Sequence, residues 1–225
     1  MIAESTQNLA PVSVPDRRCQ MKNAEFLAWL KRHKACEDAV KWVGKRSAEQ
    51  AWQDCDRADR MLWLYVRWPG MDRRTAVSAS CDCAETALRY VRPGEHRPQR
   101  AIEAARRWIA DPTDENKEAA GVAAYAAHYA AYADAVAADY AAAYDAAAYA
   151  AYAAADYADY AAAYYAAYAV ADAAAANAAV AADYAAAYAA YADAKVAAAD
   201  AYRTMAALVR RRIPSLPDTP AGAKA

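Results

Sequence analysis

Residues 140–170 read YAAAYDAAAYAAYAAADYADYAAAYYAAYAV, and the same pattern extends over residues 119–202. Those 84 positions hold 50 Ala, 16 Tyr, nine Asp and five Val. Alanine has the highest helix propensity, and Gly121 is the only Gly or Pro in the stretch. Thr113 is a good N-cap at its start. We therefore expect helix over residues 113–213.

The spacing of Tyr and Val in this region forms three stripes. On a helical wheel each stripe is rotated by roughly a third of a turn from the one before. One explanation is about three helices, with turns near Asp145 and Asn177. The other is a single long helix whose eleven-residue repeat drifts to the right. We favour long Ala/Tyr-rich helices packed closely as antiparallel segments, because a lone helix would leave sixteen Tyr rings in water.

The preceding region has a conventional composition and contains all six Trp. Its apolar residues recur at helical spacing, and no strand-like alternation appears, so the fold class is all-α. Four helices are expected, one beginning at Phe26 and the others spanning about 47–68, 72–92 and 98–111. Their core is predicted to centre on a set of large side chains: Trp52, Leu62, Trp63, Leu88, Ile102 and Trp108.

The change in composition suggests four parts along the chain. Residues 1–20 are expected to form a mobile tail, and residues 21–112 an N-terminal bundle of short helices. The Ala/Tyr/Asp-rich helical region covers residues 113–213. Residues 214–225 are predicted to be a disordered C-terminal tail.

The chain has 225 residues and a formal net charge of −1, which argues against a surface built for nucleic acid or anionic lipid. No run of eighteen apolar residues is free of Asp or Tyr hydroxyls, so a membrane span is not expected. The first residues lack the pattern of a secretory signal, and five Cys suit a reducing compartment. We expect a cytoplasmic protein.

Motifs for catalysis, metal binding or cofactors are not found. Cys81 and Cys83 lie about 200° apart on a helix, and structural zinc sites usually show C-x₂₋₄-C pairs. Buried small thiols are the favoured interpretation. The P-loop, G-x-S-x-G and H-E-x-x-H patterns are absent from the sequence. We therefore expect no enzyme activity, no metal and no cofactor.

One carboxylate, Asp59, falls on the core side of its predicted helix. A buried charge needs a partner, which Arg57, Arg60 or an arginine of a neighbouring helix can supply. We favour a structural ion pair over a recognition pocket. Six further arginines are expected to form a basic rim, either solvated or facing an anion: Arg73, Arg74, Arg97, Arg100, Arg106 and Arg107.

A protein-binding surface is predicted on the Ala/Tyr/Asp-rich region. Nine Asp against one Lys give residues 119–202 a net charge of −8, which complements a basic partner. The residues assigned to this surface are Asp134, Asp145, Asp156, Tyr149 and Tyr160. The main alternative is self-association of Ala-Tyr seams into an oligomer or filament. A nucleic-acid mimic and an ice-binding protein are disfavoured, since the Asp residues are sparse and the segment lacks Thr.

Several ordered segments carry a resemblance to a known family: ACEDAVKW (35–42), AWQDCDRADRMLWL (51–64), CAE (83–85) and RPQRAIEAARRW (97–108). Together they resemble an immunity protein family of bacterial polymorphic-toxin loci and phages. That family pairs such a module with an Ala-rich helical region, and many members end in a segment like ALVRRRIP (207–214). The resemblance implies a non-enzymatic protein that neutralises a toxin by occlusion, and it assigns no catalytic residue.

Overall fold

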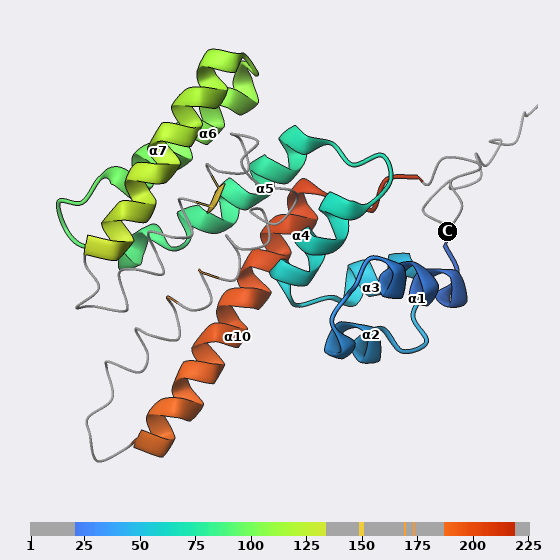
Figure 1. The fold of residues 1–225 in the computed structure, drawn as a ribbon. Helices are drawn as coiled ribbons and strands as arrows, with labels where there is room; N and C mark the ends of the chain where they lie inside the picture. The colour runs from blue at the N-terminus through green and yellow to red at the C-terminus, as the bar shows by residue number, and fades with distance from the viewer. Residues whose placement is uncertain (1–20, 134–148, 151–168, 170–172, 174–186, 219–225) are drawn as a thin grey trace, which may run out of the picture.

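The computed structural model describes residues 21–133, 149–150, 169, 173 and 187–218, and every regular element within them is helical. The all-α prediction is confirmed. Figure 1 shows the arrangement of the elements in chain order: α1 (Asn23–Arg32), α2 (Glu37–Val43), α3 (Ala48–Asp54), α4 (Ala58–Arg67), α5 (Arg73–Glu85), the 3₁₀ turn η1 (Leu88–Tyr90), α6 (Arg97–Ala110), α7 (Asp114–Ala133) and α10 (Ala187–Arg212).

Three helices begin at the caps that the sequence predicts. Ser47 forms a capping box, in which its hydroxyl accepts from the Gln50 amide at 3.2 Å and its own amide donates to Gln50 Oε1 at 2.9 Å. Asp72 Oδ2 accepts from the Thr75 amide at 2.8 Å. Thr113 Oγ1 accepts from the Asn116 amide at 3.2 Å. These side chains satisfy amides that have no partner within their helices.

The helix predicted from Ser47 to Pro69 is wrong as a single element. It is divided into α3 and α4 because Cys55 adopts an extended conformation and Arg57 stands as the N-cap of α4. The Cys55 thiol donates to the Arg57 carbonyl at 3.5 Å, and the Arg210 guanidinium donates to the Cys55 carbonyl. A partner 155 residues away thus binds the carbonyl that the break leaves free.

The third predicted helix is also shorter than expected. α5 ends at Glu85, where the hydroxyl of Thr86 donates to the Cys83 carbonyl at 2.7 Å, and η1 follows. This end leaves Leu88 half-buried instead of central to the core, and Trp63 on α4 is half-buried as well. The other four predicted core residues are buried: Trp52, Leu62, Ile102 and Trp108.

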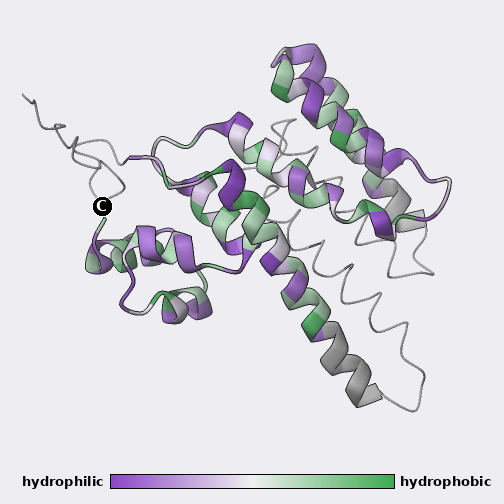
Figure 2. Cartoon of the chain, turned by 180° about the vertical axis from the view of Figure 1, so that it is seen from behind, coloured by the Kyte–Doolittle hydropathy of each residue, from purple (hydrophilic) through white to green (hydrophobic). Residues whose placement is uncertain are grey.

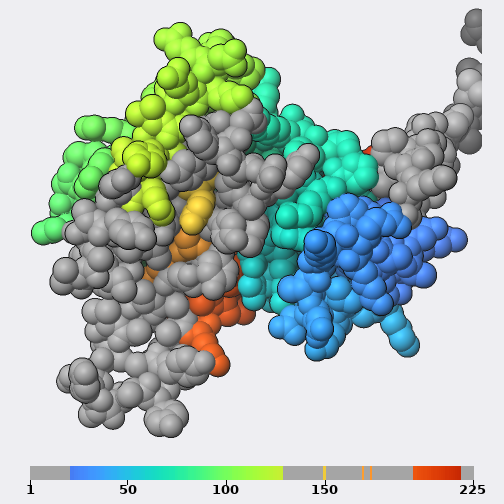
Figure 3. All heavy atoms as spheres, in the orientation of Figure 1, coloured from blue at the N-terminus to red at the C-terminus, as the bar shows by residue number. Residues whose placement is uncertain are grey.

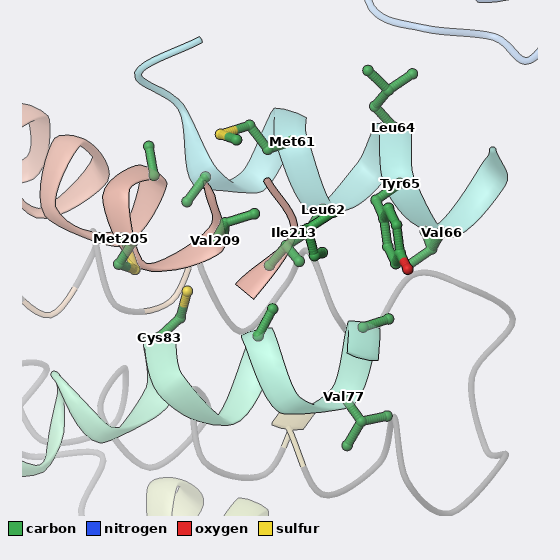
Figure 4. Packing of buried hydrophobic residues seen from close by; sticks show 14 of the residues in the cluster. Met61, Leu62, Leu64, Tyr65, Val66, Val77, Cys83, Met205, Val209 and Ile213 are labelled. Atoms are coloured by element: carbon green, nitrogen blue, oxygen red, sulfur yellow. The ribbon is translucent and has the colours of Figure 1, made fainter. Parts of the chain in front are cut away.

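The central core lies between α4, α5 and the C-terminal part of α10 (Figure 4). From α10, the side chains of Met205 and Val209 are fully buried and Ile213 just beyond it is 4% exposed. They pack in the layer formed by Leu62 of α4 and Cys83 of α5. Residues from the two ends of the chain therefore share one core.

The predicted C-terminal tail is wrong for residues 214–218, which pack onto the N-terminal helices. Leu216 is only 2% exposed. The indole of Trp52 donates to the Ile213 carbonyl at 3.1 Å, and the indole of Trp68 donates to the Pro217 carbonyl at 2.9 Å. Gly70, with φ of 78°, lies where an added Cβ would stand 3.6 Å from Pro217. Residues 219–225 lie outside the described residues.

The Ala-rich region is attached to this body at both ends. After a short connection, α7 packs against α6. Three alanines of α7, Ala120, Ala124 and Ala127, are fully buried and form its alanine seam. The C-terminal part of α10 packs on α4 and α5, and α5 contacts α6. A single straight helix over 113–213 would be about 150 Å long and would not bring its two ends to one body. The predicted turns and antiparallel pairing within 134–186, and the tail 1–20, lie outside the described residues.

The boundary in composition is therefore not a boundary in packing. We call residues 21–110 together with 201–218 the platform, because they share the core described above. Hydrophilic and hydrophobic residues alternate along its helices (Figure 2), as expected for helices that bury one face.

Candidate functional site

Asp59 and Arg57 form a paired-charge site at the start of α4. The guanidinium binds the carboxylate through two bonds, Nε to Oδ1 at 2.9 Å and Nη2 to Oδ2 at 2.7 Å. Asp59 is 8% exposed, so its carboxylate needs a partner. Of the arginines that were proposed from the sequence, Arg57 is the one that binds it. The side-chain hydrogen bonds to Asp59 raise the pKa of the Arg57 guanidinium.

The same guanidinium connects α4 to α10. Arg57 lies over the ring of Tyr202, with its central carbon 4.0 Å from the ring centroid. Tyr202 itself is 8% exposed. Cation–π contacts of this kind strengthen when they are shielded from water. The pair therefore helps to hold the C-terminal helix on the platform.

A pocket of about 490 Å³ opens beside this pair. Its walls come from α1, α2, α3 and α4 and from the break at residues 55–57. Three tryptophans line it, Trp42, Trp52 and Trp63, together with aliphatic side chains of α1 and α4. The sequence predicts the carboxylate, with a pocket beside it only as the disfavoured alternative, because the periodicity of residues 47–68 is that of one helix.

A second charged cluster, which was not predicted from the sequence, joins α5, α6 and α10. Asp82 is 6% exposed and is bound by Arg212, with Nε to Oδ2 at 3.0 Å and Nη2 to Oδ2 at 2.8 Å. Arg106 donates to Asp82 Oδ1 at 2.9 Å and also binds Glu85. A signal was present: Asp82 is the one charge within the small-residue run 76–84, which is buried throughout.

The described cysteines are not arranged for nucleophilic or redox chemistry. Burial raises the pKa of the Cys55 thiol to about 11 and that of Cys81 to about 12, and it also raises the pKa of Cys83. At neutral pH these thiols are protonated, and the thiolate is the reactive form. Cys36 is exposed. In the part of the chain that the structure describes, no three His, Cys, Asp or Glu side chains gather as metal ligands.

Three arginines of the predicted basic rim bind acidic or aromatic side chains of the chain itself. Arg106 binds Asp82, Arg97 binds Glu95, and Arg73 lies over the ring of Trp108 at 4.9 Å. Hydrogen bonding to Arg97 lowers the pKa of Glu95 to about 2. The remaining members, Arg74, Arg100 and Arg107, are exposed.

A second surface feature lies where α6 meets α7. A groove of about 470 Å³ is lined by Arg97 and Arg100 of α6 and by Glu118, Val122 and neighbouring residues of α7. Val122 is 67% exposed, and Tyr125, three residues further on, is 56% exposed. Figure 3 shows α7 at the edge of the molecule, away from α1–α3. We call Glu118, Val122 and Tyr125 the α7 surface.

Of the partner surface predicted from the sequence, Tyr149 alone lies within the described residues. It is half-buried and packs against the core cluster. Asp134, Asp145, Asp156 and Tyr160 lie outside the described residues.

Comparisons with known proteins give no assignment. The chain matches no protein-family model, no curated protein and no solved structure. Within the described residues, no helix has both the length and the apolar character needed to cross a membrane.

Proposed function

We propose that the chain is a non-enzymatic protein-binding protein that neutralises a protein partner by covering its active surface. One observation carries the proposal. Among the described residues, the large hydrophobic side chains that are exposed are Val122, Tyr125 and Val196, and all three lie on the Ala-rich helices α7 and α10. Exposed apolar residues on a helix face, rimmed by charge, are typical of interaction sites.

The chemistry of the α7 surface suits a protein partner. A tyrosine contributes a large contact area at a low cost in conformational entropy, and it is enriched in recognition surfaces. Glu118 adds negative charge beside Val122, and residues 119–202 carry a net charge of −8. The groove beside α7 is itself balanced, with two Arg and two Glu in its lining, and the Asp residues of that stretch all follow residue 133. These Asp residues would accelerate encounter with a basic partner, such as a nuclease toxin whose own surface attracts phosphates.

The platform supports this role by holding the Ala-rich region at both ends. α7 is anchored by its packing on α6, and α10 through its buried C-terminal part. Anchoring at two points reduces the conformational freedom that a partner must remove on binding. The resemblance to the immunity protein family points to the same role, with a toxin encoded by a neighbouring gene as the partner.

The test is co-expression of the chain with the product of the neighbouring gene, with growth as the readout. The wild-type chain should rescue growth, and Val122→Ser combined with Tyr125→Ser should weaken the rescue. Ala24→Ser, at an exposed position on α1, is the matched control and should rescue fully. Replacing Asp134, Asp145 and Asp156 by Asn should also weaken the rescue if charge steers the encounter.

The proposal fails if the neighbouring product is harmless and the chain rescues nothing. Self-assembly then becomes the better account if light scattering shows a concentration-dependent polymer. In that case Val122→Ser and Tyr125→Ser should dissolve the polymer, because the same exposed side chains would form the contacts between copies.

A further inference from the structure

The pocket between α1 and α4 is separate in the sequence from the α7 surface, and nothing in the proposed function uses it. Its volume is about 490 Å³, and the pocket is partly open to solvent. This volume falls within the range of roughly 300–1,000 Å³ that small-molecule sites occupy. Cys55 and Arg57, which lie at the break between α3 and α4, both line the pocket.

The walls of this pocket include several large aromatic side chains. Trp52 is fully buried, whereas Trp42 and Trp63 are half-buried. The Arg46 guanidinium lies 4.7 Å from the centroid of Trp42, and that of Arg67 lies 4.5 Å from the centroid of Trp63. Each arginine covers its tryptophan ring and restrains its rotation. The pocket is thereby lined with held aromatic surfaces suited to another aromatic ring.

The charges that line the pocket leave one cation without a partner. Arg57 and Asp59 neutralise each other. Lys34 and Asp38 also line the pocket, where both are exposed and carry opposite charges. The Arg60 side chain is half-buried in the wall, and no hydrogen bond or ion pair joins its guanidinium to any described residue. The wall therefore carries a net positive charge of +1, at a guanidinium whose donors are available.

We propose that this pocket is a binding site for a small aromatic molecule with one negative charge. The aromatic body lies against the tryptophan walls, and the anionic group receives hydrogen bonds from Arg60. A sulfonate or a carboxylate suits the guanidinium, since both accept two parallel hydrogen bonds. Bound ligand would also stabilise the folded chain, because it binds the native state and not the unfolded one.

The experiment uses the full chain and two matched probes. One is the anion 8-anilino-1-naphthalenesulfonate, and the other is its neutral analogue N-phenyl-1-naphthylamine. Fluorescence titration should give saturable binding of one anion per chain. Arg60→Met should weaken binding of the anion by about tenfold and change binding of the neutral probe little. Arg211→Met, at an exposed position on α10, is the control and should leave both affinities unchanged.

Filling the pocket shows whether the probes bind there or at another surface of the molecule. Ala39 of α2 lines the pocket and is half-buried, so Ala39→Phe should fill it and weaken both probes. Cys36 lines the same pocket and is exposed. Cys19 is first replaced by Ser so that it does not react with the label. In that variant, labelling Cys36 with N-phenylmaleimide should weaken binding of both probes as Ala39→Phe does, and the label is added to a protein that is already folded. The proposal is overturned if the anion does not bind saturably, or if Arg60→Met and the Cys36 label leave its affinity unchanged.

Discussion

The two parts of α10 are packed in different ways. In residues 195–200, Val196 is 59% exposed, and Asp200 pairs with Arg203 at the surface. In residues 201–212, Met205 and Val209 are fully buried. The sequence changes at the same place, from Ala, Tyr and Asp to larger aliphatic residues and arginines. A buried Met or Val contributes about 1.5–3 kcal/mol, which an alanine methyl group cannot match.

The same contrast separates the platform from α7. The platform is filled by Trp, Leu and Met side chains. Asp82 adds an ion pair with Arg212 of α10, and Arg57, which binds Asp59, lies over the ring of Tyr202 of α10. α7 instead packs on α6 and buries mainly alanines, which contribute little apolar area. We infer that large side chains provide the stability and that the Ala-rich helices rely on the platform.

Met205→Ala should destabilise the folded chain most. Removing a fully buried Met side chain should lower the free energy of unfolding by about 2–5 kcal/mol. Val196→Ala removes an exposed side chain of the same helix and should change the free energy of unfolding by less than about 0.5 kcal/mol. Urea unfolding followed by circular dichroism measures both. Similar changes in the free energy of unfolding for the two variants would contradict the conclusion that the two parts of α10 are packed differently.

Asp82→Ala should cost somewhat less, about 2–3 kcal/mol. It strands Arg106 and Arg212, whose side chains are 36% and 42% exposed, so water partly replaces the lost carboxylate. Asp59→Ala strands a single arginine and should cost about 1–2 kcal/mol. Thermal melts at neutral pH would rank the two variants. A neutral effect of Asp82→Ala would mean that the cluster does not hold α10 in place.

Ala124→Leu should destabilise the contact between α6 and α7 by about 1–3 kcal/mol, because the alanine seam has no room for a larger side chain. Ala207→Leu adds the same side chain at an exposed position of α10 and serves as the control. Urea unfolding should show a lower free energy of unfolding for Ala124→Leu alone. Equal behaviour of both would show that the seam is not closely packed.

Local signals predicted much of this fold. The capping residues Ser47, Asp72 and Thr113 act through neighbours three positions away, so the sequence is enough to place the helix starts. Periodicity likewise placed Trp52 and Leu62 in the core and Asp59 on the buried side of its helix. Each of these features depends on residues within one or two helical turns.

The features that were missed depend on contacts distant in sequence. The break at Cys55 is bound by Arg210, and residues 214–218 are ordered by Trp52, Gln53 and Trp68, which donate to carbonyls near the C-terminus. The pocket with Arg60 lies beside that break. A single sequence does not indicate which distant residue will meet an exposed carbonyl, so the tail was expected to be disordered.

Hydrogen exchange measured by mass spectrometry tests most directly whether the C-terminal residues belong to the platform. Backbone amides of residues 205–213 should exchange as slowly as those of residues 61–66 in α4 and 77–83 in α5, because the three segments share one core and should open together. Fast exchange of 205–213 while α4 and α5 stay protected would contradict the account.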